Sequence, residues 1–392
     1  MHDTLIKRIY ASLRRELRRI AKHPGHLLLL TGALLFCYVF FLTLMKEGQP
    51  ENLPIAVVDQ DGSYLSRRLC HELDATQGVH IEAVYGSHRE AREAMQRQEI
   101  FAFFEIPQGA YADVLDFKAP HMSIYVNNAY LLGGTLSYKT LLTMSNLASG
   151  AVQREILRKQ GYSEEKIMGL IMPIEVDVHQ IGNPSANYES YLLTTILPGI
   201  LGLLVLLLTV YVVGVELKEQ TSREWLALCG NDSFAAVVGK LLPYTFWFTL
   251  LAVVGNLVLF GLFKFPFAGN FLLLVLTTVL FVLAMQATGV FLVGVLPVMR
   301  DALSIAAFYG LFGFSLSGFT YPVSSMGPAL QTISYLFPLR LYYLIYVNEA
   351  LYATGFAAVA PYLCGLAAFL LLPFLTARRL HKAFVEQNYP LK

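Results

Sequence analysis

The chain has 392 residues, of which 55% are hydrophobic and 15% charged, and its mean hydropathy is +0.52. This composition excludes a water-soluble globular protein and indicates a chain that crosses a membrane several times. The net charge of +1 gives no reason to expect nucleic acid as a partner, so the positions of Lys and Arg along the chain are more informative than their sum.

An amphipathic helix is predicted over residues 3–22. Leu and Ile recur there every three or four positions, and basic residues cover the remaining surface. Residues 1–26 are therefore expected to form a cytoplasmic elbow helix that lies in the inner membrane interface. A basic segment that binds anionic lipid electrostatically is the simpler interpretation, and it is compatible with an elbow helix.

Six apolar runs are long enough to cross a hydrocarbon core about 30 Å thick. Their centres carry no Asp, Glu, Lys or Arg, each of which would cost roughly 2.5–3.5 kcal/mol there. The first run has no small-residue cleavage site nearby, so it predicts an uncleaved anchor rather than a signal peptide. The predicted spans are residues 27–45, 191–215, 239–262, 271–296, 302–319 and 358–377.

Basic residues predict that both ends of the chain are cytoplasmic. Seven Lys or Arg precede the first span, and four lie in the tail of residues 378–392. Residues 329–347 are apolar enough to compete as a seventh span, but Pro338 and Arg340 divide this run into pieces that are too short to cross. A seventh crossing would also place the basic tail outside.

The mostly polar residues 46–190 are predicted to form a separate extracytoplasmic domain between the first and second spans. Strand-like and helix-like patterns alternate along it, which is typical of an α/β fold. The predicted strands are residues 55–61, 79–86, 100–107, 121–129 and 173–181, and the predicted helices are residues 63–75, 87–99 and 131–160.

Signals of catalysis and of metal binding are weak. The run "CHELD" begins like a zinc-protease helix, but Ala75 stands where the second His is required. Cys70 is the single cysteine of the outer domain, which favours a buried apolar side chain over a mixed disulfide. We therefore expect no catalytic, cofactor-binding or metal-binding residues. The other histidines of the outer domain lack ligand spacing: His80, His88, His121 and His179.

Gly239 and Lys240 end a charged segment and invite comparison with a nucleotide-binding loop. The comparison fails, because Phe234 replaces the first Gly of the phosphate-binding pattern and Leu241 replaces its hydroxyl residue. Lys240 is instead expected to lie at the headgroup level at the start of a span. The chain is not expected to bind ATP itself.

Residues 216–238 are predicted to be a cytoplasmic segment between the second and third spans, and residues 216–228 within it to be a short amphipathic helix. Such a helix either presents a face on which another protein docks or is a solvated connector between the two spans. The residues alone favour these two interpretations equally.

The chain resembles the permease subunits of type-two ATP-binding-cassette exporters, in the branch with a large periplasmic domain between the first and second transmembrane helices. The order and spacing of four local matches carry the resemblance. These are "RRELRRIAKHPGHL" before the first span, "NPSANYESYLLTTILPGI" entering the second, "ELKEQTSREWLAL...VVGKLLP" after the second, and "LSGFTYPVSSMGPALQTISYLFPLRLYY" after the fifth.

The resemblance implies that the segment after the second span docks on a separate cytoplasmic ATPase subunit, which binds ATP and Mg. It also implies a turn into the third span, and paired re-entrant helices over residues 320–348 that cap the translocation path on the outer side. The implied docking residues are Glu216, Lys218, Glu219, Arg223, Glu224 and Trp225. The implied turn comprises Gly239, Lys240 and Pro243, and the implied cap includes Gly318, Tyr321, Pro322, Met326 and Pro338.

The resemblance further implies a dimer with a second permease copy or a paralogue. Small residues of the fifth span would allow close helix packing, either between copies or within one chain. These are Gly310, Gly313, Ser315, Ser317 and Gly318.

We therefore expect a permease subunit without enzymatic activity in the bacterial inner membrane that exports a hydrophobic, lipid-like, peptide-like or drug-like substrate. The outer domain would contact substrate or a periplasmic adaptor. A membrane-anchored receptor or scaffold is the main alternative, although the short inner loops leave no room for a signalling domain. A membrane-embedded hydrolase is disfavoured, because its spans would need polar residues.

Overall fold

The computed structural model describes residues 5–174, 176–387 and 389, apart from the side chain of His26. The chain divides into two compact units, which are a helical unit of Met1–Lys46 with Gln180–Lys392 and an α/β unit of Glu47–His179. The α/β unit ends before the predicted limit at residue 190. Residues 180–187 belong with the helices that follow them.

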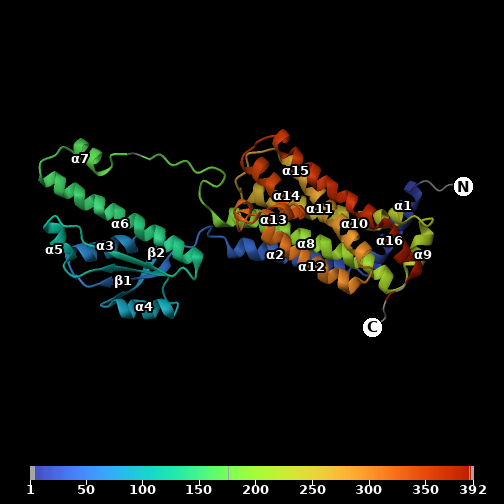
Figure 1. Cartoon of the computed structure of the whole chain (residues 1–392), viewed down its shortest axis with the longest axis horizontal. Coiled ribbons are helices and arrows are strands. Elements are labelled where there is room, and N and C mark those ends of the chain that lie inside the picture. The colour runs from blue at the N-terminus through green and yellow to red at the C-terminus, as the bar shows by residue number, and fades with distance from the viewer. Residues whose placement is uncertain (1–4, 175, 388, 390–392) are drawn as a thin grey trace. The chain divides into compact units, whose positions relative to one another are not determined.

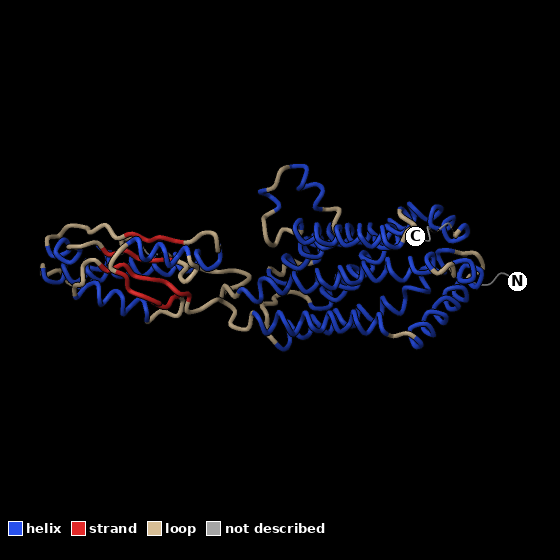
Figure 2. Tube along the Cα trace, turned by 90° about the horizontal axis from the view of Figure 1, so that it is seen from below, coloured by secondary structure: helices blue, strands red, loops and turns tan. Residues whose placement is uncertain are grey.

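The α/β unit is built on a four-stranded sheet with the strand order β2-β1-β3-β4. β1 is parallel to both of its neighbours, and β4 is antiparallel to β3. All the strands of the described chain lie in this unit (Figure 2). The strands are β1 (Leu53–Asp59), β2 (Val79–Tyr85), β3 (Ala102–Ile106) and β4 (Ser123–Val126).

Helices cover both faces of the sheet (Figure 1). Because side chains alternate along a strand, Ile55 and Val57 pack under α3 and α6, whereas Ala56 and Val58 pack against α4. Ser63 and Ser87 cap the first turns of α3 and α4 with their hydroxyls. The helices are α3 (Tyr64–Asp74), α4 (His88–Gln96), α5 (Ala110–Leu115), α6 (Leu131–Lys159) and α7 (Glu164–Ile171).

The prediction of a last strand over residues 173–181 is wrong for the part of this segment that the structure describes. Ile174, Val176, Val178 and Ile181 are each more than 70% exposed, so the alternating pattern has no sheet to pack against. The short helices α5 and α7 were not predicted. Each is too short to show a helical period clearly.

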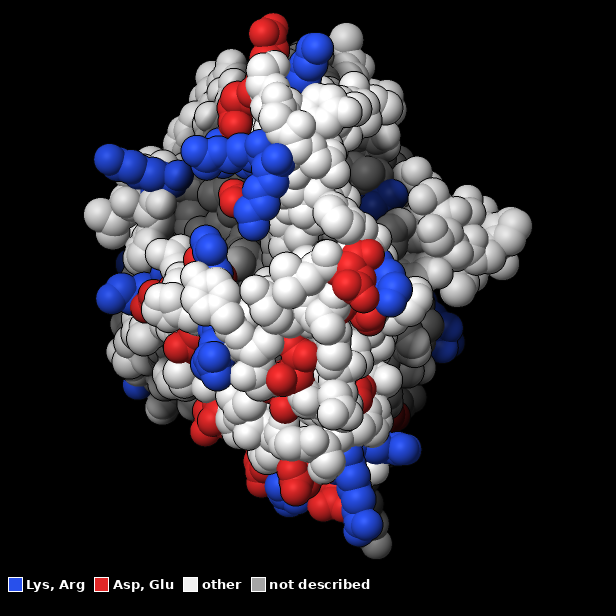
Figure 3. All heavy atoms as spheres, turned by 90° about the vertical axis from the view of Figure 1, so that its left-hand side faces the viewer, with Lys and Arg blue, Asp and Glu red and all other residues white. Residues whose placement is uncertain are grey.

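The helical unit begins with α1 (Leu5–Lys22) and α2 (Gly25–Leu44) and continues after the α/β unit. Figure 3 shows the end of the molecule formed by the α/β unit, where charges of both signs are interspersed. The remaining helices up to residue 316 are α8 (Tyr188–Lys218), α9 (Ser222–Leu228), α10 (Ser233–Leu257) with a π-helical end η1 (Val258–Leu262), α11 (Phe271–Val295) and α12 (Met299–Leu316).

Short helices follow α12 before the last long helix. The run 329–347 is broken between residues 334 and 338, so it does not form one continuous crossing helix. Phe356–Glu386 is a single long helical stretch with a tighter turn in its middle. The elements are η2 (Val323–Ser325), α13 (Pro328–Ser334), α14 (Pro338–Ile345), η3 (Tyr346–Leu351), α15 (Phe356–Ala368), η4 (Phe369–Leu371) and α16 (Leu372–Glu386).

Five helices among the described residues are long and apolar enough to cross a membrane, which is consistent with a polytopic membrane protein. The fifth predicted span, residues 302–319, corresponds to α12, which is not among the five and carries Arg300 and Asp301 in its first turn. α8 lies at the centre of the unit and packs against α11 and α12. The five helices are Leu27–Leu44, Tyr188–Lys218, Ser233–Leu262, Phe271–Val295 and Phe356–Glu386.

Candidate functional site

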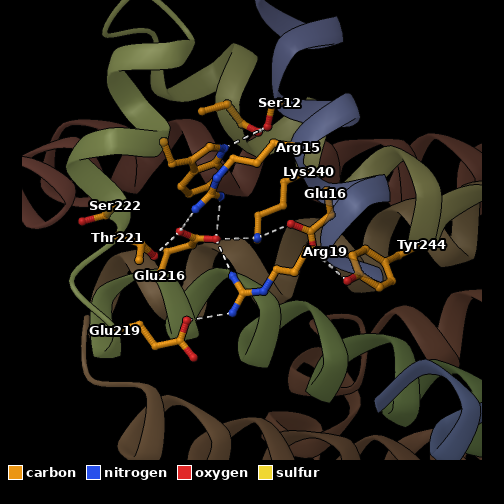
Figure 4. Close-up of polar contacts among 12 residues, drawn as sticks. Ser12, Arg15, Glu16, Arg19, Glu216, Glu219, Thr221, Ser222, Lys240 and Tyr244 are labelled. Carbon is orange, nitrogen blue, oxygen red and sulfur yellow. Dashed lines mark hydrogen bonds and ion pairs between the residues drawn. The ribbon is translucent and has the colours of Figure 1, made fainter. Parts of the chain in front are cut away.

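Three charged side chains are buried together at the end of the helical unit where α1, α9 and α16 meet (Figures 1 and 4). Glu16 comes from α1, Glu216 from the last turn of α8 and Lys240 from α10. Their exposures are 2%, 0% and 0%. With Arg15 and Arg19 of α1 they form what we call the buried charge cluster.

Lys240 joins the two carboxylates. Its Nζ lies 2.5 Å from Glu16 Oε2 and 2.8 Å from Glu216 Oε1. Tyr244, one turn further along α10, donates its hydroxyl to Glu16 Oε1 at 2.7 Å. Both oxygens of Glu16 are thereby satisfied, although water cannot reach them.

Glu216 also forms ion pairs with Arg15 and Arg19 of α1. Arg15 binds it through two parallel hydrogen bonds of 2.8 and 2.9 Å, and Arg19 Nη1 reaches its Oε1 at 2.8 Å. Thr221 adds a hydroxyl at 2.5 Å from Oε2. Burial opposes the charged form of Arg15, but its hydrogen bond and attraction to Glu216 outweigh this and raise the pKa of the guanidinium.

The cluster contains two carboxylates and three cations, and it joins α1 to α8 and α10, which lie about 200 residues further along the chain. A buried ion pair adds little net stability over a well-packed apolar core, whereas the loss of one partner leaves an uncompensated charge and costs about 3–5 kcal/mol. The cluster therefore fixes how α1, the end of α8 and the start of α10 sit against one another.

Gly239 explains how α1 can approach α10 closely. A Cβ atom at this position would lie 2.3 Å from the backbone oxygen of Ile9 and 2.7 Å from the Cβ of Ser12. Ser12 donates to the carbonyl of Ala236 at 2.7 Å and accepts a hydrogen bond from Trp225 Nε1 at 2.8 Å. The contact thus also anchors α9.

α9 is held from the other side by the end of α16. Ser222 donates to the carbonyl of Phe384 at 2.9 Å, and the Trp225 and Phe384 rings meet edge to face with centroids 5.2 Å apart. Arg223 Nε donates to the Val385 carbonyl at 2.5 Å. The segment after α8 is therefore packed against α1, α10 and α16 rather than forming a free connector.

The structure separates the predicted docking residues into two groups. Glu216 and Trp225 are fully buried by the chain's own helices, so neither presents a surface to another protein. Lys218 and Glu224 are exposed and have no ion pair in the part of the chain that the structure describes. Two further exposed residues already have partners within the chain: Glu219 pairs with Arg19, and Arg223 donates a hydrogen bond to α16.

The predicted turn into the third span lies inside a helix instead. α10 begins at Ser233, because the Asp232 carboxylate caps the backbone N–H groups of Phe234 and Ala235. Gly239, Lys240 and Pro243 are therefore helical. Lys240 does not extend its side chain toward lipid headgroups as expected, because its ammonium group binds Glu16 and Glu216 inside the protein.

The residues predicted to form the outer cap lie around two short helices. Gly318 follows α12 with a φ of +94°, and Arg340 Nη1 donates to the Ser317 carbonyl at 2.7 Å. Pro338 starts α14 and is buried, whereas Tyr321 is exposed. The other two predicted residues flank η2, which follows Pro322 and precedes Met326.

Sequence reasoning missed the α1 half of the site: Ser12, Arg15, Glu16 and Arg19. One signal was present, because Glu16 is the single acidic residue within the otherwise basic helix Leu5–Lys22. Its partners on α8 and α10 are about 200 residues away in sequence, so only the tertiary structure identifies them.

Metal binding has no candidate site among the residues that the structure describes. The residues that the structure describes contain no group of three or more His, Cys, Asp or Glu side chains that could hold a metal ion. The four cysteines are unpaired with one another. That the chain is not an enzyme remains a prediction.

The sequence pattern of the ABC-2 family transporter proteins matches residues 27–379, which is most of the chain. The chain belongs to this family. Two curated relatives, both called probable multidrug ABC transporter permease YbhR and found in Escherichia coli K12 and O157:H7, are each 21% identical to it. The match covers 86% of this chain and 88% of each relative.

Family membership bears on the site in one respect. An ABC-2 permease works with an ATPase subunit, so some part of its surface must receive that partner.

Proposed function

We propose that this ABC-2 chain is the permease subunit of an exporter in the bacterial inner membrane, powered by a separate cytoplasmic ATPase subunit. The observation that carries the proposal is the way in which α9 is held by the rest of the chain. This short helix offers exposed side chains on one side and is tied on the other to α1, α10 and α16.

The docking surface of the proposal is the outer face of α9. Glu224 and Leu228 are exposed and lie four positions apart, so they share one face of the helix. Leu228 is 57% exposed, which suits an apolar contact with a partner. An acidic residue beside an apolar one offers both the charge and the apolar area that a specific protein contact uses.

The buried charge cluster supports a way for motion to pass from α9 into the membrane helices. A push on α9 acts through Trp225 on Ser12 of α1, and α1 is joined by Glu16 to Lys240 of α10. Glu216 connects the same group to α8. Because the charges cannot separate without a large cost, these helices would move together.

The proposed topology has six crossings, with α12 as the fifth, and both termini in the cytoplasm. Basic residues before α2 and in the tail of residues 378–392, which begins within α16, support it. The α/β unit would then be periplasmic, where it could contact substrate or an adaptor. It belongs, on this proposal, to the branch of the family with a large periplasmic domain.

A second permease copy would pack on the exposed side of α12. Gly310 of this helix packs within the chain, since a Cβ at this position would lie 2.4 Å from the side chain of Leu203. The opposite side carries large exposed apolar residues at helical spacing, which gives it the apolar area that a second copy could cover. They are Ile305, Phe308, Leu311 and Phe312.

The proposed substrates are hydrophobic, lipid-like, drug-like or peptide-like. The relatives are named as probable multidrug permeases, and the long apolar helices contain few charged groups outside their ends. A substrate without strong charge would suit such a path.

The test is co-purification with an ATPase encoded beside this chain. The double change Glu224→Arg with Leu228→Glu should abolish the complex while the melting temperature of the permease stays unchanged. Lys264→Glu, an exposed charge reversal beyond the other end of α10, is the matched control and should leave the complex intact. An undiminished complex with the double variant would contradict the docking surface.

A further inference from the structure

A groove lies on the helical unit between α10, α11 and α16. Its volume is about 260 Å³, and its lining is mostly apolar. Val238 and Leu242 line it from α10, Leu283 and Val290 from α11, and Phe374 from α16. All three helices are among those that are long and apolar enough to cross a membrane.

One polar side chain in this apolar lining is only half satisfied. Gln286 of α11 is 4% exposed. Its Oε1 accepts a hydrogen bond from Thr245 Oγ1 at 2.7 Å, but its Nε2 has no hydrogen-bond partner among the described residues. Buried amide groups are normally paired, so an unpaired donor that lines a groove points to a missing acceptor.

The rim of the groove at the α9 end is polar. Ser233 lines the groove, and its hydroxyl lies 2.7 Å from His381 Nδ1 on α16. An apolar lining with a few placed polar groups is the usual composition of a small-molecule site.

The groove and the buried charge cluster lie on different sides of the same stretch of α10. Val238 and Leu241 line the groove, whereas Gly239 and Lys240 between them face α1 and the cluster. A ligand in the groove therefore presses on the turn of α10 that holds Lys240.

We propose that this groove binds an acyl chain or apolar ring system that carries one carbonyl group, and that the carbonyl accepts a hydrogen bond from Gln286. The ligand stabilises one position of α10 and so acts on the buried charge cluster. Binding requires no partner protein. Through the cluster, the ligand would also change ATP hydrolysis by the partner subunit, and this effect rests on the proposed function.

The binding test uses the purified full chain in detergent and two photoactivatable probes. One is a methyl palmitate that carries a diazirine in its chain, and the other is a hydrocarbon of equal length with the same diazirine but no ester. The ester probe should label peptides of α10, α11 and α16 more strongly. Gln286→Leu should reduce ester labelling by about tenfold, to the level of the hydrocarbon.

Two further variants separate loss of the site from loss of the fold. Val238→Trp fills the groove and should reduce labelling by both probes. Leu276→Trp, at an exposed position of α11 outside the groove, should reduce neither. Equal labelling by the two probes in the unaltered chain, or full labelling of the Val238→Trp variant, would overturn the proposal.

Two additional experiments determine the source of the ligand and whether its binding affects ATP hydrolysis. Displacement of the ester probe by excess phosphatidylethanolamine identifies a bilayer lipid as the occupant, whereas retention identifies a free amphiphile. In the complex with the ATPase, the ester probe should change the hydrolysis rate at least twofold, and Gln286→Leu should abolish that response. No response with intact binding contradicts the coupling step alone, and failure of the complex to form contradicts the proposed function instead.

Discussion

Lys240 of α10 and Glu216 of α8 form an ion pair of 2.8 Å in which the two side chains are 1% and 0% exposed. The residues are close in sequence but lie on opposite sides of the α9 segment. Because Glu16, Arg15 and Arg19 complete the pair from α1, the charged segment between α8 and α10 is anchored inside the protein. Three predictions concern this anchoring and the outer cap.

Removal of the Lys240 charge should destabilise the helical unit. Lys240→Met leaves Glu16 and Glu216 without their shared cation, so the free energy of unfolding should fall by about 3–5 kcal/mol. The melting temperature in detergent measures this loss. Lys218→Met, which removes an exposed lysine from the same region, is the control and should have little effect. Equal melting temperatures for the two variants would show that the cluster does not stabilise the helical unit.

Gly239→Ala should separate α1 from α10. The added methyl group would meet the Ile9 carbonyl at 2.3 Å, which backbone atoms cannot accommodate without movement. A decrease in melting temperature and faster proteolysis after α1 are expected. Gly261→Ala is the matched control, because nothing lies within 4 Å of its new Cβ. If Gly239→Ala matches the control, the close contact does not form.

Gly318→Ala should disturb the outer cap. The φ of +94° is unfavourable for any residue with a Cβ, and that atom would lie 2.4 Å from Arg340 Nη1. A loss of about 1–2 kcal/mol is expected from the backbone alone, with weakening of the hydrogen bond from Arg340 to Ser317. Gly327→Ala, in open space next to α13, should be tolerated. Thermal unfolding of both variants checks the difference.

The proposed dimer surface makes a fourth prediction. The double change Phe308→Ser with Leu311→Ser should convert a dimer into a monomer, because both side chains are about 60% exposed on one face of α12. Phe246→Ser, at a 70% exposed position of α10, should not. Mass photometry of the detergent-solubilised protein distinguishes the two states. A dimer that persists in the double variant would place the interface elsewhere.

Much of the architecture follows from local patterns. Long apolar runs locate the long helices, short apolar runs locate the buried strands β1 and β3, and the alternation of apolar and polar residues locates β2. The same alternation fails at residues 173–181, where a regular pattern has no sheet beside it. A period in the sequence therefore indicates structure only where a packing partner exists.

The functional site was predictable only in part. Residues 216–228 could be recognised as a distinct charged segment, but the division into buried Glu216 and Trp225 and exposed Glu224 could not, since it depends on α1 and α16. Lys240 was misplaced for the same reason. A charged residue near the end of an apolar run can reach the headgroups or a buried partner, and the local sequence does not distinguish these cases.

The most direct test of the account is photo-crosslinking from the surface of α9 to the ATPase subunit in the assembled complex. A photoreactive amino acid at Leu228, which is 57% exposed, should give an adduct with the ATPase, and the same amino acid at Leu262, which is 72% exposed beyond the other end of α10, should give none. An ATPase adduct from Leu262, or the absence of one from Leu228 in an intact complex, would contradict the assignment of α9 as the docking helix.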